Sequence, residues 1–188
     1  MNRREALSAV ALLLGGTIIG AEAFLSGCNT PVKKTGIFGT NDIALLDEVG
    51  ETILPTTASS PGAKEAKIGE FMKTIVTDCY EEKDQKTFTE GIGKLNEVSK
   101  KKYNKHFMEL AATDKHELLV ELDKEAKNYQ KDKKKEDPNH YFTMMKQLTL
   151  WGYFTSEPGA TKALRYVAVP GRYDGCVPYK KGDKAWAT

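Results

Sequence analysis

Apolar residues recur at helical spacing along most of the chain, and few alternating β-branched runs are present to build a sheet. The clearest period covers residues 68–80, where apolar side chains follow i, i+3, i+4, i+7, i+8 and i+11. We predict an amphipathic helix here, whose inward face carries the following residues: Ile68, Phe71, Met72, Ile75, Val76 and Cys79.

Three more segments have the same spacing. Residues 42–54 form a helix that Asn41 or Asp42 can cap and that Pro55 ends. Residues 84–103 form the next, and a further helix starts at Thr113 or Asp114, where Asp114 and Glu117 have capping-box spacing. The inward residues of these last two are Phe88, Ile92, Leu95 and Val98, then Leu118, Leu122, Ala126 and Tyr129. The charged run that follows, 127–140, reads as a solvated helix end and loop, with a basic patch for lipid headgroups or an acidic partner as the alternative.

The segment 140–166 is rich in large apolar residues on more than one helical face. One stripe holds Tyr141, Met144, Met145, Leu148 and Trp151, whereas Phe142, Leu150, Tyr153 and Phe154 point elsewhere. Such a helix is either central to its own core or buried by a partner. A short helix with Pro158 in its first turn follows.

Beyond this helix the chain is rich in proline and glycine, and it includes the stretch PGRYDGCVP (170–178). We therefore predict an all-α fold, a compact helical domain with an irregular C-terminal tail. A length of 188 residues, with 40% hydrophobic and 29% charged residues, fits one soluble globular domain. The net charge of +2 is too small for a typical nucleic-acid-binding protein, so we expect no nucleic acid partner.

The first residues have the pattern of an export signal. Arg3 and Arg4 precede an uncharged, mostly apolar run over residues 9–21, which is too short to span a bilayer comfortably. The run leads to LSGC, which is similar to the lipobox of bacterial lipoproteins and marks Cys28 as the lipidated residue. A plain signal peptide with a coincidental cysteine is the alternative. We predict a signal peptide over 1–27, a tether over 28–40 and the helical domain over 41–188.

The twin arginines have a second implication. NRREAL resembles a twin-arginine export signal, although Ala6 and Ser8 depart from the usual pattern and an ordinary secretory signal stays open. We expect an envelope lipoprotein that faces the periplasm or the cell surface and is held to a membrane by its acyl chains.

Two cysteines remain after Cys28, namely Cys79 and Cys176. An oxidising compartment favours disulfides, so these two are disulfide candidates. They can pair with each other or one can pair with a partner protein, and Cys79 can also stay a buried thiol on an apolar helix face.

No motif for catalysis or cofactor binding stands out. The histidines His106, His116 and His140 are scattered and lack metal-binding spacing, and the sequence contains no CxxC. We therefore predict no catalytic, metal or cofactor-binding residue, and an enzyme that binds metal through the histidines is the weaker reading.

Five stretches make the body resemble the gluconate 2-dehydrogenase subunit 3 family. These are LLDEVGETILP (45–55), PGAKEAKIGEF (61–71), DCY (78–80), LTLWGYFTSEPGATKAL (148–164) and VPGRYDGCVP (169–178), with AWAT at the end. The resemblance implies a non-catalytic small subunit that supports export, maturation and stability of a large subunit of the glucose-methanol-choline type. FAD is expected in that large subunit, which oxidises a sugar or sugar acid and passes electrons to a cytochrome c.

The lipobox is not general in this family, and it suggests that this subunit also tethers the complex to a membrane. We take Trp151, Tyr153, Phe154 and Tyr173 as candidates for partner contact, with a place in the domain's own core as the alternative. A stand-alone helical envelope lipoprotein that binds a small ligand is the alternative function.

Overall fold

The computed structural model describes residues 37–187, and this part of the chain is helical. The α-helices are α2 (Thr40–Ile53), α3 (Ile68–Cys79), α4 (Glu82–Tyr103), α5 (Ala112–Asp132) and α6 (Tyr141–Thr155). A 3-10 turn, η1 (Phe107–Glu109), precedes α5, and a π-helical segment, η2 (Gly159–Ala163), follows α6. The only β-type pairing in this range is an isolated bridge between Arg165 and Trp186. The all-α prediction is confirmed.

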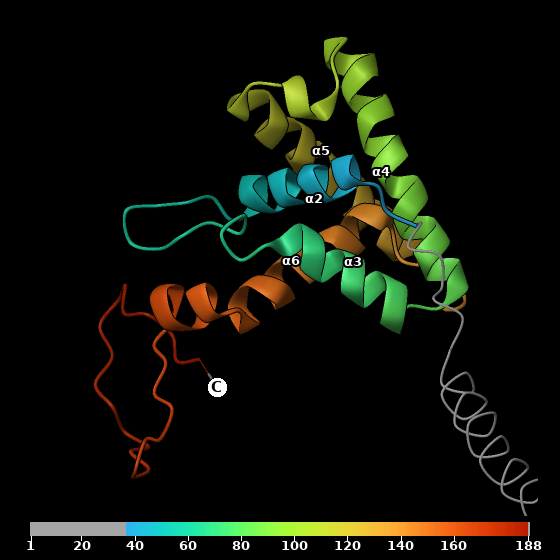
Figure 1. The fold of residues 1–188 in the computed structure, drawn as a ribbon. Helices are drawn as coiled ribbons and strands as arrows, with labels where there is room; N and C mark the ends of the chain where they lie inside the picture. The colour runs from blue at the N-terminus through green and yellow to red at the C-terminus, as the bar shows by residue number, and fades with distance from the viewer. Residues whose placement is uncertain (1–36, 188) are drawn as a thin grey trace, which may run out of the picture. The chain divides into compact units, whose positions relative to one another are not determined.

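Helix α6 is the centre of the domain. It contacts α2, α3, α4 and α5, and Figure 1 shows α2 and α3 lying side by side in front of it. Apolar residues around most of α6 explain this position, because they meet the neighbouring helices, whereas Leu150, Trp151 and Phe154 are exposed. A central place in the domain's own core is therefore confirmed for the buried sides of α6. Its buried residues are Tyr141, Phe142, Met144, Met145, Leu148, Thr149, Gly152 and Tyr153.

A glycine brings α4 close to α6. A Cβ atom added to Gly91 of α4 would lie 2.4 Å from the Cβ of Tyr141 at the start of α6. Real Cβ atoms do not approach that closely, so only glycine allows this packing distance between the two backbones.

The inward faces agree with the predicted periodicity in α3, α4 and α5, with exceptions near the helix ends. Ile68, Met72, Val76, Phe88, Leu95, Leu118 and Leu122 are fully or almost fully buried. Cys79, by contrast, is exposed, because it is the last residue of α3. Tyr129 of α5 is also exposed, so its predicted inward position is wrong.

The predicted helix starts need correction. Helix α2 has Gly39 as its N-cap residue, and Asp42 lies three positions inside, where its carboxylate accepts a hydrogen bond of 2.8 Å from the Gly39 backbone N–H. Helix α5 starts at Ala112, so Asp114 lies in its first turn and no side chain caps it. The end of α2 just before Pro55 is as predicted.

Glu51 near the end of α2 organises the connection to α3. Its carboxylate accepts hydrogen bonds from the backbone N–H of Thr56 at 2.8 Å and of Lys64 at 3.0 Å, and from the Thr56 hydroxyl at 2.8 Å. Burial opposes ionisation, but these hydrogen bonds outweigh it and lower the pKa of Glu51. A Cβ at Gly62 would lie 2.2 Å from a Glu51 carboxylate oxygen, so a larger residue there would displace this carboxylate from its hydrogen bonds.

A largely buried ion pair joins α5 to α2. Lys115, only 9% exposed, donates from Nζ to Oε1 of Glu48 at 2.8 Å, and exposed Lys64 reaches Oε2 of Glu48 at 3.2 Å. The hydrogen bond from Lys115 holds the pKa of the Glu48 carboxyl below its ordinary value of 4.5, against the opposing effect of burial. Ionised Glu48 therefore stabilises the folded state.

We expect the free energy of unfolding to fall as the pH drops below about 4.5. The pKa of Glu48 is lower in the folded state than in the unfolded state. The ion pair therefore contributes its full stabilisation at pH values above the unfolded-state pKa, and this stabilisation is lost as the pH falls through the folded-state pKa. Glu48→Gln should lower the free energy of unfolding by about 1–2 kcal/mol at neutral pH. It should also reduce the fall of the urea-unfolding midpoint as the pH is lowered. Glu90→Gln, which breaks only exposed pairs with Lys86 and Lys94, is the control and should change little. An equal fall of the urea-unfolding midpoint with decreasing pH in wild type and Glu48→Gln would contradict this expectation.

The signal segment, Cys28 and most of the tether lie outside the described residues, so those predictions are not examined by the structure. Among residues 37–187, no helix combines the length and the apolar character that crossing a bilayer requires.

Candidate docking surface

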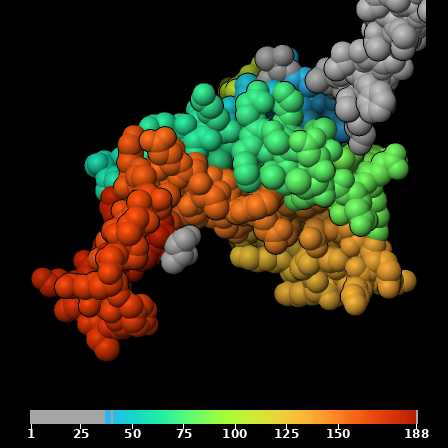
Figure 2. Space-filling model, turned by 60° about the horizontal axis from the view of Figure 1, so that its bottom comes forward, coloured from blue at the N-terminus to red at the C-terminus, as the bar shows by residue number. Residues whose placement is uncertain are grey.

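The last part of the described chain, residues 165–187, leaves the helical body as an irregular loop, here called the C-terminal arm. It is red in Figure 1, and Figure 2 shows it projecting from one end of the body. Every residue from 166 to 186 is exposed, and Tyr173 is 94% exposed. The large apolar residues exposed on the arm are Tyr166, Val167, Val169, Tyr173, Val177, Tyr179 and Trp186. The prediction of an irregular C-terminal tail is confirmed.

The two ends of the arm are fastened together. The backbone N–H of Arg165 donates to the carbonyl of Ala185 at 2.8 Å, and the N–H of Ala187 donates to the carbonyl of Arg165 at 2.7 Å. The guanidinium of Arg165 stacks on the Trp186 ring, 4.3 Å from its centroid. Lys184 adds a hydrogen bond from Nζ to the carbonyl of Lys162, just after α6. We call these contacts the arm clasp. They make the arm a closed loop rather than a free tail.

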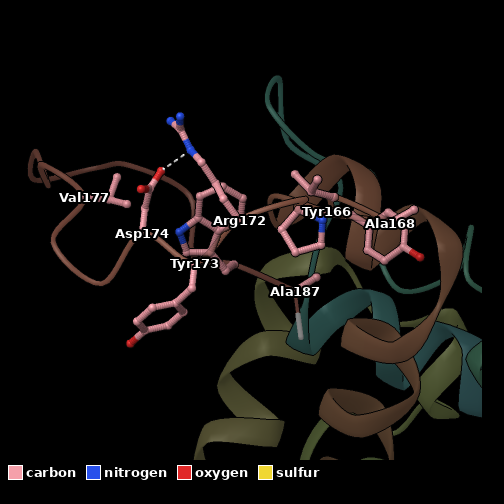
Figure 3. A pocket seen from close by; sticks show the side chains of 10 residues that line it. Tyr166, Ala168, Arg172, Tyr173, Asp174, Val177 and Ala187 are labelled. Atoms are coloured by element: carbon pink, nitrogen blue, oxygen red, sulfur yellow. Dashed lines mark hydrogen bonds and ion pairs between the residues drawn. The ribbon is translucent and has the colours of Figure 1, made fainter.

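The closed arm surrounds a recess of about 710 Å³. Figure 3 shows the side chains that line it, together with the ion pair of 2.8 Å between Arg172 Nε and an Asp174 carboxylate oxygen. The lining is mainly apolar and aromatic, and is formed by Tyr166, Val167, Ala168, Pro170, Arg172, Tyr173, Asp174, Val177, Trp186 and Ala187. A concave apolar surface with a few polar groups is suited to receiving an apolar group of another molecule.

A second exposed apolar surface lies on α6. Leu150, Trp151 and Phe154 are spaced to share one side of the helix, and all three are exposed. Phe71 of α3 packs edge-on against Trp151, with ring centroids 5.4 Å apart, and this contact helps to hold the orientation of the indole ring. Leu150, Trp151 and Phe154 are called the α6 patch.

The four residues predicted for partner contact divide into two groups. Trp151, Phe154 and Tyr173 are exposed and free to meet a partner. Tyr153, by contrast, is only 3% exposed, and its hydroxyl donates to the carbonyl of Pro61 in the α2–α3 connection. Tyr153 therefore belongs to the core of the domain, because α6 turns this side toward α2 and α3.

The cysteines are not joined within the described residues. Cys79 and Cys176 are both free and both exposed, the first at the end of α3 and the second in the arm. An intrachain disulfide and a buried Cys79 thiol are therefore absent from this structure.

The histidines do not converge on a metal site. His140 caps α6, where its Nδ1 accepts from the Phe142 backbone N–H at 3.3 Å, and its Nε2 lies 3.6 Å from Glu125. Burial lowers its pKa below the ordinary value of 6.5. Among residues 37–187, no group of three His, Cys, Asp or Glu side chains is placed to hold a metal ion.

Sequence reasoning missed the arm clasp. Its partners, Arg165 and Trp186, are far apart in the chain and follow no period that a sequence pattern would reveal. The available signal was Trp186 itself, a large aromatic residue in an otherwise irregular tail.

Comparison with known protein families gives one match. The family model described as gluconate 2-dehydrogenase subunit 3 matches residues 40–171, from the start of α2 into the first part of the arm. No curated protein and no solved structure matches the chain.

Proposed function

We propose, because the chain belongs to the gluconate 2-dehydrogenase subunit 3 family, that it is the non-catalytic small subunit of a membrane-bound, FAD-dependent sugar or sugar-acid dehydrogenase. In this proposal the large subunit binds FAD and oxidises the substrate, and a cytochrome c accepts the electrons. The small subunit supports export and maturation of the large one, and lipidated Cys28 tethers the complex to the membrane.

The exposed C-terminal arm is the observation that supports this role most strongly. A monomeric soluble protein rarely exposes so many large apolar residues on one short segment, because each loses contact with other apolar atoms and orders water around it. Tyrosine and tryptophan, which are repeated here, are the residues that most often dominate the binding energy of protein interfaces. An accessory subunit needs such a surface, whereas a self-sufficient envelope protein does not.

The test is to express the large FAD-dependent subunit with and without the full chain. We expect flavin absorbance and sugar-dehydrogenase activity in the envelope fraction only when both are present, and no activity from the small subunit alone. A large subunit that reaches the envelope with full flavin content and activity without this chain would contradict the proposal.

A further inference from the structure

We propose that the C-terminal arm is the element that docks the large subunit, and that its recess receives an apolar segment of that subunit flanked by acidic residues. This rests on the proposed function and adds to it the surface used and the chemistry of the partner. Three features of the arm lead to it: its charge, its concave shape and its closed base.

The arm carries a net positive charge, whereas the rest of the chain is close to neutral overall. Residues 165–187 contain five basic and two acidic residues, a net charge of +3, whereas the whole chain carries +2. Both carboxylates are already engaged within the arm: Asp174 pairs with Arg172, and Asp183 accepts from the Lys180 backbone N–H at 2.9 Å. Lys180 and Lys181 are exposed, and neither side chain forms an ion pair within the described residues. A complementary partner surface is therefore acidic.

The recess favours a protein partner over a lipid surface. A bilayer is flat on the scale of a loop and would contact the outer residues of the arm, whereas a recess of about 710 Å³ is filled only by a group that protrudes. Large apolar side chains that protrude from a protein surface have that shape. Burying them against Tyr166, Val177 and Trp186 removes apolar surface of both molecules from water.

The arm clasp reduces the cost of docking. The backbone bridge and the stacking of Arg165 on Trp186 hold the ends of the loop together before any partner binds. A loop already closed loses less conformational entropy on binding than a free tail of equal length. The clasp thus positions the recess, and the side chains within it supply the contact.

The charge is tested with the complex in a neutral detergent, where no bilayer is present. The triple variant Arg172→Glu, Lys180→Glu, Lys181→Glu should weaken binding of the full chain to the large subunit by about tenfold or more, and should remove the salt dependence of the wild-type affinity. The matched control, Lys131→Glu, Lys134→Glu, Lys135→Glu, makes the same charge change on exposed residues at the end of α5 and in the loop after it. It should keep the wild-type affinity.

The recess is tested by filling it. Ala168 lines the recess, whereas its neighbour Val169 is exposed and does not line it. Ala168→Trp should weaken binding of the large subunit by about tenfold, because a bulky ring occupies the space that the partner needs. Val169→Trp adds a similar ring outside the recess and should leave the affinity within about twofold of wild type.

The outcomes separate this inference from the proposed function. A complex that forms with wild-type affinity in both the charge-reversal triple and Ala168→Trp would overturn the inference and leave the accessory role standing. If that triple variant instead binds the large subunit normally but loses affinity for phosphatidylglycerol vesicles, the arm is a membrane contact and the inference is wrong. Failure of the wild-type chain to bind any large FAD-dependent subunit would overturn both.

Discussion

Gly91→Ala is expected to destabilise the domain by about 1–3 kcal/mol, although alanine is the better helix former. The added methyl group would lie 2.4 Å from the Cβ of Tyr141 and 2.6 Å from its Cγ. Tyr141 is buried at the start of central α6, so it cannot swing away, and α4 and α6 must move apart. The separation loosens the packing of α4 against α6, and this lost packing is the source of the destabilisation. Urea unfolding followed by circular dichroism measures it.

Gly93→Ala, on the same helix, is the matched control. Nothing lies within 4 Å of a Cβ added at Gly93, so only the intrinsic helix preference acts there. We expect it to stabilise the domain by about 0.5–1 kcal/mol. If the two variants shifted the unfolding midpoint in the same direction by a similar amount, the close approach of α4 and α6 at Gly91 would be contradicted.

Ending the chain after Leu164 is expected to abolish binding to the large subunit while leaving the helical domain folded. The buried core is made entirely of residues before the arm, and residues 166–186 are exposed, so their removal takes away no core packing. The exposed apolar residues that we assign to docking are removed together. We expect the melting temperature to change by no more than a few degrees and the affinity to fall by about a hundredfold or more.

A second variant tests whether docking needs the side chains of the arm or only a loop of the same length. Replacing residues 166–184 by a glycine-serine linker of equal length keeps Arg165 and Trp186, and with them the two ends of the arm. It should lose binding as fully as the truncation does. Retained binding in either variant would move the docking site to another surface, of which the α6 patch is the first to examine through Trp151→Ala.

The amphipathic helices were predictable because burial on one side leaves a period in the sequence. Residues 68–80 and 84–103 were placed almost correctly, since Ile68, Met72, Phe88 and Leu95 repeat at helical spacing and all face the core. The central position of α6 also follows from its composition, because a helix that is apolar on more than one side buries most of its surface against neighbouring helices.

The errors fall where tertiary contacts override the local pattern. Cys79 continues the apolar period of α3, but it is the last residue of the helix and its side chain is exposed. Gly39 rather than Asn41 or Asp42 caps α2, because the Asp42 carboxylate reaches back to the Gly39 N–H. Tyr153 resembles an interface aromatic, but the contact of its hydroxyl with Pro61, a residue remote in sequence, makes it part of the core. No period in the sequence encodes such pairings.

Membership of the subunit 3 family establishes the class of complex, and we propose that this chain acts in it as an accessory partner of a flavoprotein. The most direct measurement is purification of the tagged, detergent-solubilised mature chain, with a flavin absorbance spectrum and gels run with and without reductant. We expect a large flavin-containing subunit to co-purify in a fixed ratio and to be lost when the arm is removed. A colourless chain that purifies alone as a stable monomer in mild detergent would contradict it.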